Sequence, residues 1–101
     1  MLDHIYSKNP YIVILLGDFN AKLSNWRDTD PDSHEGKKIE NTTSSYGMNQ
    51  LISDPTFVLP HTSSCIDLIF TNQPDLLAKS RVHPSLHRNC HHQITYVEIN
   101  F

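Results

Sequence analysis

The sequence predicts one small α/β domain that is built mainly from strands, with one or two helices. Two apolar runs, residues 11–16 and 65–71, are rich in β-branched side chains, and residues 93–101 alternate in polarity. Such runs are typical of strands when turn residues bound them. A length of 101 residues fits a single small domain or a piece of a larger one.

The composition is that of a folded chain without a membrane-spanning segment. Hydrophobic residues make up 38% and charged residues 19%, whereas disordered tails are less apolar and more charged. The longest apolar run, residues 11–16, is far short of the roughly 20 residues that span a bilayer. A net charge of −3 argues against tight DNA binding through a basic surface alone. A phosphate-cleaving site can use the charge of a metal ion instead.

The beginning of the sequence and its cysteines indicate a nuclear or cytoplasmic protein that is not secreted. Residues 1–4 have neither the basic region nor the apolar region of a signal peptide. The two cysteines, Cys65 and Cys90, are too few for a disulfide framework, so we expect reduced thiols.

The first half of the chain predicts a strand between two helices. Residues 1–8 have apolar side chains at helical spacing, and Asn9-Pro10 breaks that helix. Residues 11–16 predict a strand that is covered on both faces and ends at Gly17. Residues 21–36 are polar and predict a long surface loop, a feature that is usually functional in a small domain. A short helix is expected at residues 36–46, with Gly47 as its end.

The second half predicts further strands. The expected elements are short strands at residues 51–52 and 56–58, a strand at 65–71, a turn at 72–75 and a strand at 93–101. Residues 76–82 fit either a strand or a helical turn.

Gly17-Asp18-Phe19-Asn20 follows the first strand and is the first candidate site. If extended geometry continues, Asp18 and Asn20 point the same way and Phe19 points toward the core. A carboxylate beside a carboxamide suits Mg²⁺ or the positioning of a water molecule. The alternative is a simple turn, since Gly, Asp and Asn are common turn residues.

Asp67 is the second candidate, because it lies inside an apolar strand. Burial of a lone carboxylate is costly, so Asp67 needs a hydrogen-bonding or charged partner. Histidine is a natural partner, because the carboxylate orients the imidazole. The alternative is an aspartate on the solvent face of an edge strand, or one that accepts backbone hydrogen bonds.

The third candidate is a histidine-rich segment, residues 83–92, that also contains Cys90. It allows a zinc site that includes Cys90 and His87, although the Cys-x-x-Cys pair of strong zinc motifs is absent. It also allows one catalytic histidine among exposed ones, or a polar loop. In residues 21–36, Trp26 is expected to pack over its own loop, although a Trp26–Arg27 pair could also stack on a base. Lys37-Lys38 predicts a solvated face.

Three blocks in this order resemble the endonuclease/exonuclease/phosphatase superfamily, and more narrowly the apurinic-type endonuclease domain of non-LTR retrotransposon polyproteins that carry reverse transcriptase. The blocks are Ile14-Leu-Leu-Gly-Asp-Phe-Asn-Ala21, Ser63-Ser-Cys-Ile-Asp-Leu-Ile-Phe-Thr71 and residues 82–94. The resemblance implies a DNase I-like fold, in which residues 1–101 form the C-terminal half of a two-sheet β-sandwich flanked by helices. The N-terminal half, with its metal-binding glutamate, is then expected to be missing.

The resemblance also implies a role for each matching residue. Asp18 resembles the aspartate that aligns the attacking water, and Asn20 the asparagine that holds the phosphate or metal. Asp67 resembles the buried aspartate that orients the catalytic histidine, and His91 resembles that histidine. His92 gives a second possible registry. Family members usually have Ser-Asp-His at the last motif, whereas this chain has Asn89-Cys90-His91.

The implied activity is Mg²⁺-dependent hydrolysis of DNA phosphodiester bonds, with Mn²⁺ as an alternative ion. The implied partners are target DNA and a reverse transcriptase domain in the same polyprotein, and no membrane. Because the metal glutamate is expected to be missing, the chain alone is expected to have little activity. A small zinc-binding module and a non-catalytic interaction fragment are the competing hypotheses, and a phosphatase of the same superfamily is a weaker one.

Overall fold

The computed structural model describes residues 1–85 and 90–99, which form a mixed α/β structure. The elements in chain order are α1 (Leu2–Tyr6), β1 (Ile14–Asp18), α2 (His34–Ser45), β2 (Asn49–Gln50), β3 (Phe57–Val58), β4 (Ser63–Ser64), β5 (Asp67–Thr71), the short 3-10 helix η1 (Pro74–Leu76), β6 (Leu77–His83) and β7 (Ile94–Ile99). The predicted α/β class, with mostly strands and few helices, is confirmed.

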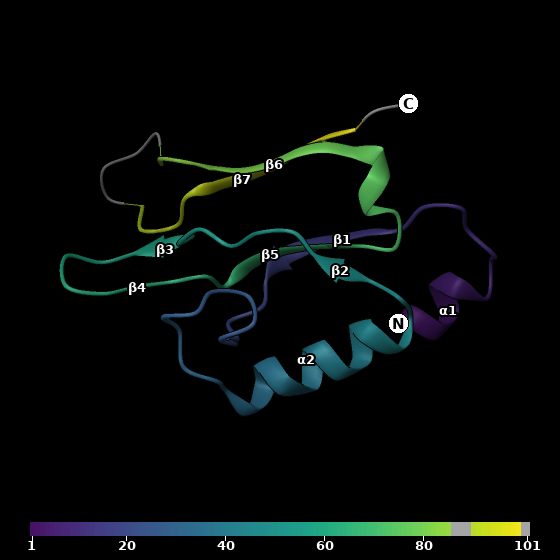
Figure 1. Cartoon of the computed structure of the whole chain (residues 1–101), viewed down its shortest axis with the longest axis horizontal. Helices are drawn as coiled ribbons and strands as arrows, with labels where there is room; N and C mark the ends of the chain where they lie inside the picture. Colours follow the sequence, from purple (N-terminus) through teal and green to yellow (C-terminus); the bar gives the residue numbers. More distant parts are fainter. Residues whose placement is uncertain (86–89, 100–101) are drawn as a thin grey trace.

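The described strands form three small antiparallel sheets. The central sheet has the order β1-β5-β2, and β3-β4 and β6-β7 are hairpins. Figure 1 shows the β6–β7 hairpin on one side of the central sheet and α2 on the other. Val82 and Val97 of that hairpin pack against the buried core. The complete two-sheet sandwich remains a prediction.

The core is organised around β5, the middle strand of the central sheet. Leu68, Ile69 and Phe70 are at most 1% exposed. The rings of Phe19 and Trp26 both meet Phe70 edge-on, at centroid distances of 5.5 and 6.0 Å. A strand with both faces covered needs apolar side chains on both faces, which explains the continuous apolar run in β5.

The strand predicted at residues 11–16 differs from the observed β1. β1 begins at Ile14 and runs through Gly17 to Asp18, and among the described strands it pairs only with β5. Leu16 is 62% exposed, so the prediction that this strand is covered on both faces is wrong. An apolar run does not distinguish an edge strand from a central one, because the difference lies in which neighbours the fold supplies.

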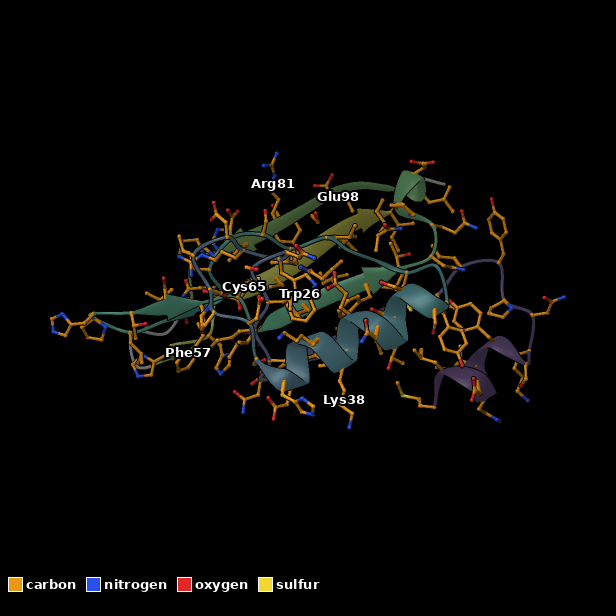
Figure 2. All side chains as sticks on the ribbon, turned by 60° about the horizontal axis from the view of Figure 1, so that its bottom comes forward. Trp26, Lys38, Phe57, Cys65, Arg81 and Glu98 are labelled. Carbon is orange, nitrogen blue, oxygen red and sulfur yellow. The ribbon has the colours of Figure 1, made fainter. Side chains whose placement is uncertain are left out.

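The segment predicted as a surface loop, residues 21–36, is a loop up to Ser33, where α2 follows, but a few of its side chains belong to the core. Ala21, Leu23 and Trp26 are buried, and Figure 2 shows Trp26 between α2 and the sheet. The prediction that Trp26 packs over its own loop is wrong, because the buried indole packs against Phe70 of β5. The segment is polar in sequence because most of its intervening side chains face water, while a few apolar ones anchor it.

An ion pair within this segment is hydrogen-bonded to β4 and to Cys65, which precedes β5. The Arg27 guanidinium donates to Asp30 at 2.9 Å and to the backbone oxygen of Ser63 at 3.1 Å. Asp30, which is 5% exposed, accepts the backbone N–H of Cys65 at 2.8 Å. The charge of the buried Asp30 is thus compensated, as a buried carboxylate requires.

Helix α2 is close to its predicted range of 36–46. It begins two residues earlier, at His34, because the Ser33 hydroxyl caps it by accepting the N–H of Gly36 at 2.9 Å. The helix ends before Gly47, whose φ of 70° is readily adopted by glycine. Lys37 and Lys38 are exposed, as predicted.

Most of the remaining predictions hold with shifted boundaries, whereas the strand predicted at 51–52 is wrong, because both residues lie outside the strands. The helix at residues 1–8 appears as α1, the strand at 65–71 as β5, the strand at 93–101 as β7, and the ambiguous segment 76–82 as β6. β2 lies just before the strand predicted at 51–52, β3 lies within 56–58, and η1 overlaps the turn at 72–75. β4 was not predicted, since two serines carry no strand signal. In the described part of the chain, no helix has the length and apolarity to cross a bilayer.

Replacement of Gly36 by alanine is expected to destabilise the protein, although alanine is the better helix former. Glycine-to-alanine changes inside exposed helices usually stabilise by about 1 kcal/mol. Here an added Cβ would collide with the backbone carbonyl of Lys22. We expect the free energy of unfolding in urea to fall by about 1–3 kcal/mol. The matched control is Lys37→Ala, at an exposed position of the same helix. Its free energy of unfolding should stay within about 0.5 kcal/mol of the wild-type value. A Gly36→Ala variant that is more stable than the wild type would contradict this packing.

Candidate functional site

Two carboxylates meet where β1 and β5 come together at one edge of the central sheet. In the antiparallel register, Asp18, the last residue of β1, lies directly opposite Asp67, the first residue of β5. Side chains of directly opposed residues share one face of a sheet, and like charges there repel. A cation or a proton between these two residues therefore stabilises the end of the sheet.

Asp67 is held in place by a buried threonine. The backbone N–H groups of Ile66 and Asp67 both donate to Thr56 Oγ1, at 3.0 and 2.9 Å. Thr56 is fully buried, and the Asp67 side chain is only 16% exposed. The sheltered carboxylate accepts hydrogen bonds from His92 Nδ1 at 2.9 and 3.2 Å. The prediction that Asp67 has a histidine partner is confirmed.

The edge of β3 positions His92. The N–H of Val58 donates to the His91 oxygen at 2.9 Å, and the N–H of Gln93 donates to the Thr56 oxygen at 2.6 Å. Phe57 and His92 form an antiparallel bridge between these bonds, and their rings contact at a centroid distance of 4.9 Å. Backbone pairing and ring contact together direct the His92 imidazole toward the sheet edge.

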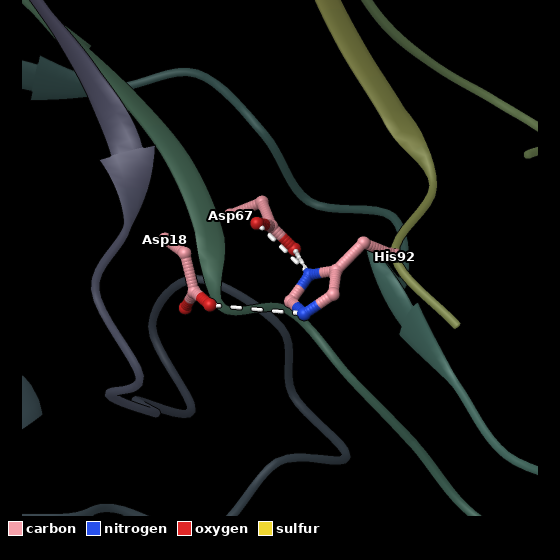
Figure 3. Close-up of side chains that lie close together, drawn as sticks. All are labelled: Asp18, Asp67 and His92. Carbon is pink, nitrogen blue, oxygen red and sulfur yellow. Dashed lines mark hydrogen bonds and ion pairs between the residues drawn. The ribbon is translucent and has the colours of Figure 1, made fainter. Parts of the chain in front are cut away.

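The imidazole of His92 lies between the two carboxylates (Figure 3). Its Nδ1 contacts Asp67, and its Nε2 lies 3.7 Å from Asp18 Oδ2. The hydrogen bond with Asp67 is the main cause that raises the pKa of His92. Burial, the next largest effect, lowers it, and the negative charges of Asp67 and Asp18 raise it. His92 therefore holds its positive charge to a higher pH than an ordinary histidine.

The structure pairs Asp67 with His92 in place of the predicted His91. His91 is exposed, and its ring lies edge-on to Phe57 at a centroid distance of 5.9 Å. Adjacent residues on an extended segment point to opposite sides, so only one of the two histidines can face the sheet edge. The hydrogen bonds to β3 select His92, which is the second registry that the sequence allowed.

Asn20 lies beside the site in a turn. Its φ is 47°, and its backbone N–H donates to Asp18 Oδ1 at 2.9 Å. The extended backbone therefore ends before Asn20. The prediction that the side chains of Asp18 and Asn20 point the same way assumed that the strand continues, and the backbone does not support it. Phe19 does pack against the core, as predicted.

Asp18, Asp67 and His92 could hold a metal ion. One ligand atom from each lies within 4.8 Å of the others, and the described residues contain no second group of three such acidic, histidine or cysteine side chains. Both oxygens of Asp67 contact His92, whereas the Asp18 side chain is 46% exposed. Asp18 is therefore the carboxylate that can offer a hard oxygen to an incoming Mg²⁺.

The zinc site predicted around Cys90 and His87 has no counterpart among the described residues. His87 lies outside them, and His83, Cys90 and His91 belong to no metal-binding group that they form. Cys65 is fully buried, and burial is the main cause that raises its pKa to about 12. Its thiol therefore stays protonated and is a poor metal ligand.

A cavity beside α1 lies away from the carboxylates. It has a volume of about 440 Å³ and is lined mainly by apolar side chains of α1, β1 and α2, among them Leu2, Leu15, Ile39 and Tyr46. None of Asp18, Asp67 and His92 lines it. We place the chemistry at the open sheet edge, because the reactive groups converge there and not in the cavity.

The pKa of His92 provides a direct test of this geometry. We expect an NMR titration to give His92 a midpoint above the ordinary value of 6.5, and Asp67→Asn to lower it, since the main hydrogen bond is weakened. Because the pKa of His92 is raised in the folded state, the protonated imidazole stabilises the folded protein. This stabilisation is fully present below the pKa that His92 has in the unfolded chain. It is lost as the pH rises through the folded pKa. A midpoint at or below the ordinary value in the wild-type protein would rule out the contact.

Comparisons with known proteins identify the family of the chain. Residues 1–95 match the family model described as endonuclease-reverse transcriptase. No curated protein and no solved structure gives a significant match. The match covers nearly the whole chain and includes Asp18, Asp67 and His92. The chain therefore belongs to the endonuclease-reverse transcriptase family, within the endonuclease/exonuclease/phosphatase superfamily of retrotransposon polyproteins.

Proposed function

We propose that this chain carries part of the active site of a divalent-metal-dependent endonuclease that nicks target DNA for retrotransposition. The observation that carries the proposal is the contact of His92 with both Asp67 and Asp18 in a chain of the endonuclease-reverse transcriptase family. A half-exposed carboxylate beside an oriented imidazole can act on water and on a phosphate at the same time.

Asp18 is the residue that acts on the attacking water molecule. Its side chain is 46% exposed at the rim, and the N–H of Asn20 fixes its Oδ1 at 2.9 Å. The fixed carboxylate can orient a water molecule for attack on phosphorus and accept its proton. The carboxamide of Asn20 is the second proposed contact to the phosphate or the metal.

His92 is the group that binds the scissile phosphate. Asp67 holds Nδ1 at 2.9 Å, so Nε2 points outward past Asp18. The raised pKa favours the form of His92 with a proton on Nε2, and this proton can be donated to a phosphate oxygen as negative charge develops. Asp67 acts through His92 by fixing its orientation and charge. This assignment gives His92 the role that the sequence resemblance gave to His91.

The donor set fits a hard cation. Asp18 offers a carboxylate oxygen, and Asn20 has a carboxamide oxygen close by in sequence. Magnesium commonly uses one or two carboxylates, together with water and substrate phosphate. A bound Mg²⁺, or Mn²⁺ in its place, would supply positive charge to the phosphate and the leaving oxygen.

We propose DNA as the substrate and a reverse transcriptase domain of the same polyprotein as the partner. The family description, endonuclease-reverse transcriptase, supports both. The net charge of −3 does not favour DNA binding through a general basic surface. In this proposal the contact with the scissile phosphate therefore contributes more to DNA binding than surface charge does. A nuclear or cytoplasmic location follows from this role.

We also propose that residues 1–101 form part of a larger sandwich and have little or no nuclease activity by themselves. In the described cluster, both oxygens of Asp67 contact His92, so Asp18 is the half-exposed carboxylate that a metal ion can reach. We expect no more than trace nicking of supercoiled plasmid with Mg²⁺. Robust turnover by the purified chain would refute this part of the proposal.

Binding measurements test the site without requiring turnover. We expect a short DNA duplex with Mg²⁺ to shift the NMR signals of Asp18 and His92, and Mn²⁺ to broaden them. His92→Ala should weaken DNA binding and abolish any trace nicking, since removal of such a group typically costs about 10²–10⁴-fold in rate.

His91→Ala is the matched control, because His91 is adjacent, exposed and has no contact with Asp67 or Asp18 among the described hydrogen bonds. It should behave as the wild type. DNA-induced shifts that avoid Asp18 and His92, or an equal effect of both histidine variants, would count against the proposed site.

A further inference from the structure

β1 is an outer strand of the central sheet, and its outer edge can accept another strand. The sheet has the order β1-β5-β2, and in the described part of the chain β1 pairs with β5 alone. Opposite Leu16 lies Ile69, whose backbone oxygen accepts the N–H of Leu51 on the β2 side. In an antiparallel pair, hydrogen-bonded residues alternate with residues whose N–H and C=O groups point away from the partner strand. The N–H and C=O of Leu16 therefore point to the outer edge, and so do those of Ile14 and Asp18.

This edge has few of the features that protect edge strands. Natural proteins cover such edges, or place lysine or proline along them, and so prevent pairing with another chain. β1 has the sequence Ile-Leu-Leu-Gly-Asp, with neither lysine nor proline. Leu16, at its centre, is 62% exposed, and Gly17 and Asp18 are exposed as well. An exposed strand edge with an apolar centre favours pairing with a further strand.

A second copy of β1 is complementary to this edge. If two β1 strands pair antiparallel about a twofold axis at Leu16, the two leucines oppose each other, and Ile14 of one copy opposes Asp18 of the other. All three residues have their backbone groups at the outer edge, so each opposed pair can exchange two hydrogen bonds. The two Asp18 carboxylates lie at opposite ends of the pairing, so no like charges are opposed. This register combines an apolar contact at the centre with an absence of charge repulsion at the ends.

We propose that this chain forms a weak symmetric homodimer, in which β1 pairs antiparallel with β1 of a second copy and Leu16 lies at the centre. Such a contact uses the same edge on both copies and is closed, so it gives dimers and not longer assemblies. Two strands of five residues bury little surface, and interfaces smaller than about 1,200 Å² are typical of weak complexes. The dimer goes beyond the proposed nuclease function and requires neither a metal ion nor DNA.

Analytical ultracentrifugation of the chain, without metal ions or DNA, tests the dimer. We expect the average mass to rise from that of one chain toward that of two between about 10 µM and 1 mM. Leu16→Lys would oppose two positive charges at the centre of the pairing and should weaken the dimer at least about tenfold. The variant should fold, because Leu16 is mostly exposed in the single chain. Tyr11→Lys is the matched control: it adds the same charge at a position that is 73% exposed and precedes β1, and it should leave the dimer unchanged.

Amide hydrogen exchange of the wild-type chain provides a second measurement that needs no variant. The N–H of Leu16 should exchange at least about tenfold more slowly at the higher concentration, because the second copy accepts a hydrogen bond from it. The N–H of Leu15 points to β5 and should be protected at both concentrations. A chain that stays monomeric over the whole range, a species larger than the dimer, or a dimer that Leu16→Lys does not weaken would overturn the proposal. Equal exchange of the Leu16 amide at both concentrations, or equal weakening by Tyr11→Lys, would overturn it as well.

Discussion

The site depends on the opposition of two aspartates at the end of one strand pair. The β1–β5 register places Asp18 against Asp67, and two carboxylates in such positions repel each other. The imidazole of His92 relieves this repulsion by lying between them. The same arrangement that stabilises the sheet edge also provides an oriented imidazole beside a half-exposed carboxylate.

Two supports outside the central sheet keep this arrangement in place. Thr56 accepts the N–H groups that precede the body of β5, and its own backbone oxygen receives the N–H of Gln93. One buried threonine thus connects Asp67 to the segment that carries His92. Arg27 and Asp30 fix Ser63 and Cys65 just upstream, so the polar segment between β1 and α2 also supports the site.

The three side chains differ in solvent exposure, which suits them to different roles. Asp67 is sheltered at 16% exposure, whereas His92 and Asp18 are 40% and 46% exposed. A sheltered carboxylate fixes the orientation of its histidine partner and favours its protonated form, while exposed groups are accessible to solvent, substrate and ions.

Several features could be predicted from local sequence alone. The apolar run that becomes β5, the helix that ends at Gly47 and the need of Asp67 for a partner each depend on a few neighbouring residues and on the cost of burying a charge. The exposure of Leu16 and the burial of Trp26 depend on tertiary packing. The choice of His92 over His91 depends on it as well. Two adjacent residues of an extended segment point in opposite directions, and only the hydrogen bonds from a distant segment, residues 56–58, decide which histidine faces the carboxylates.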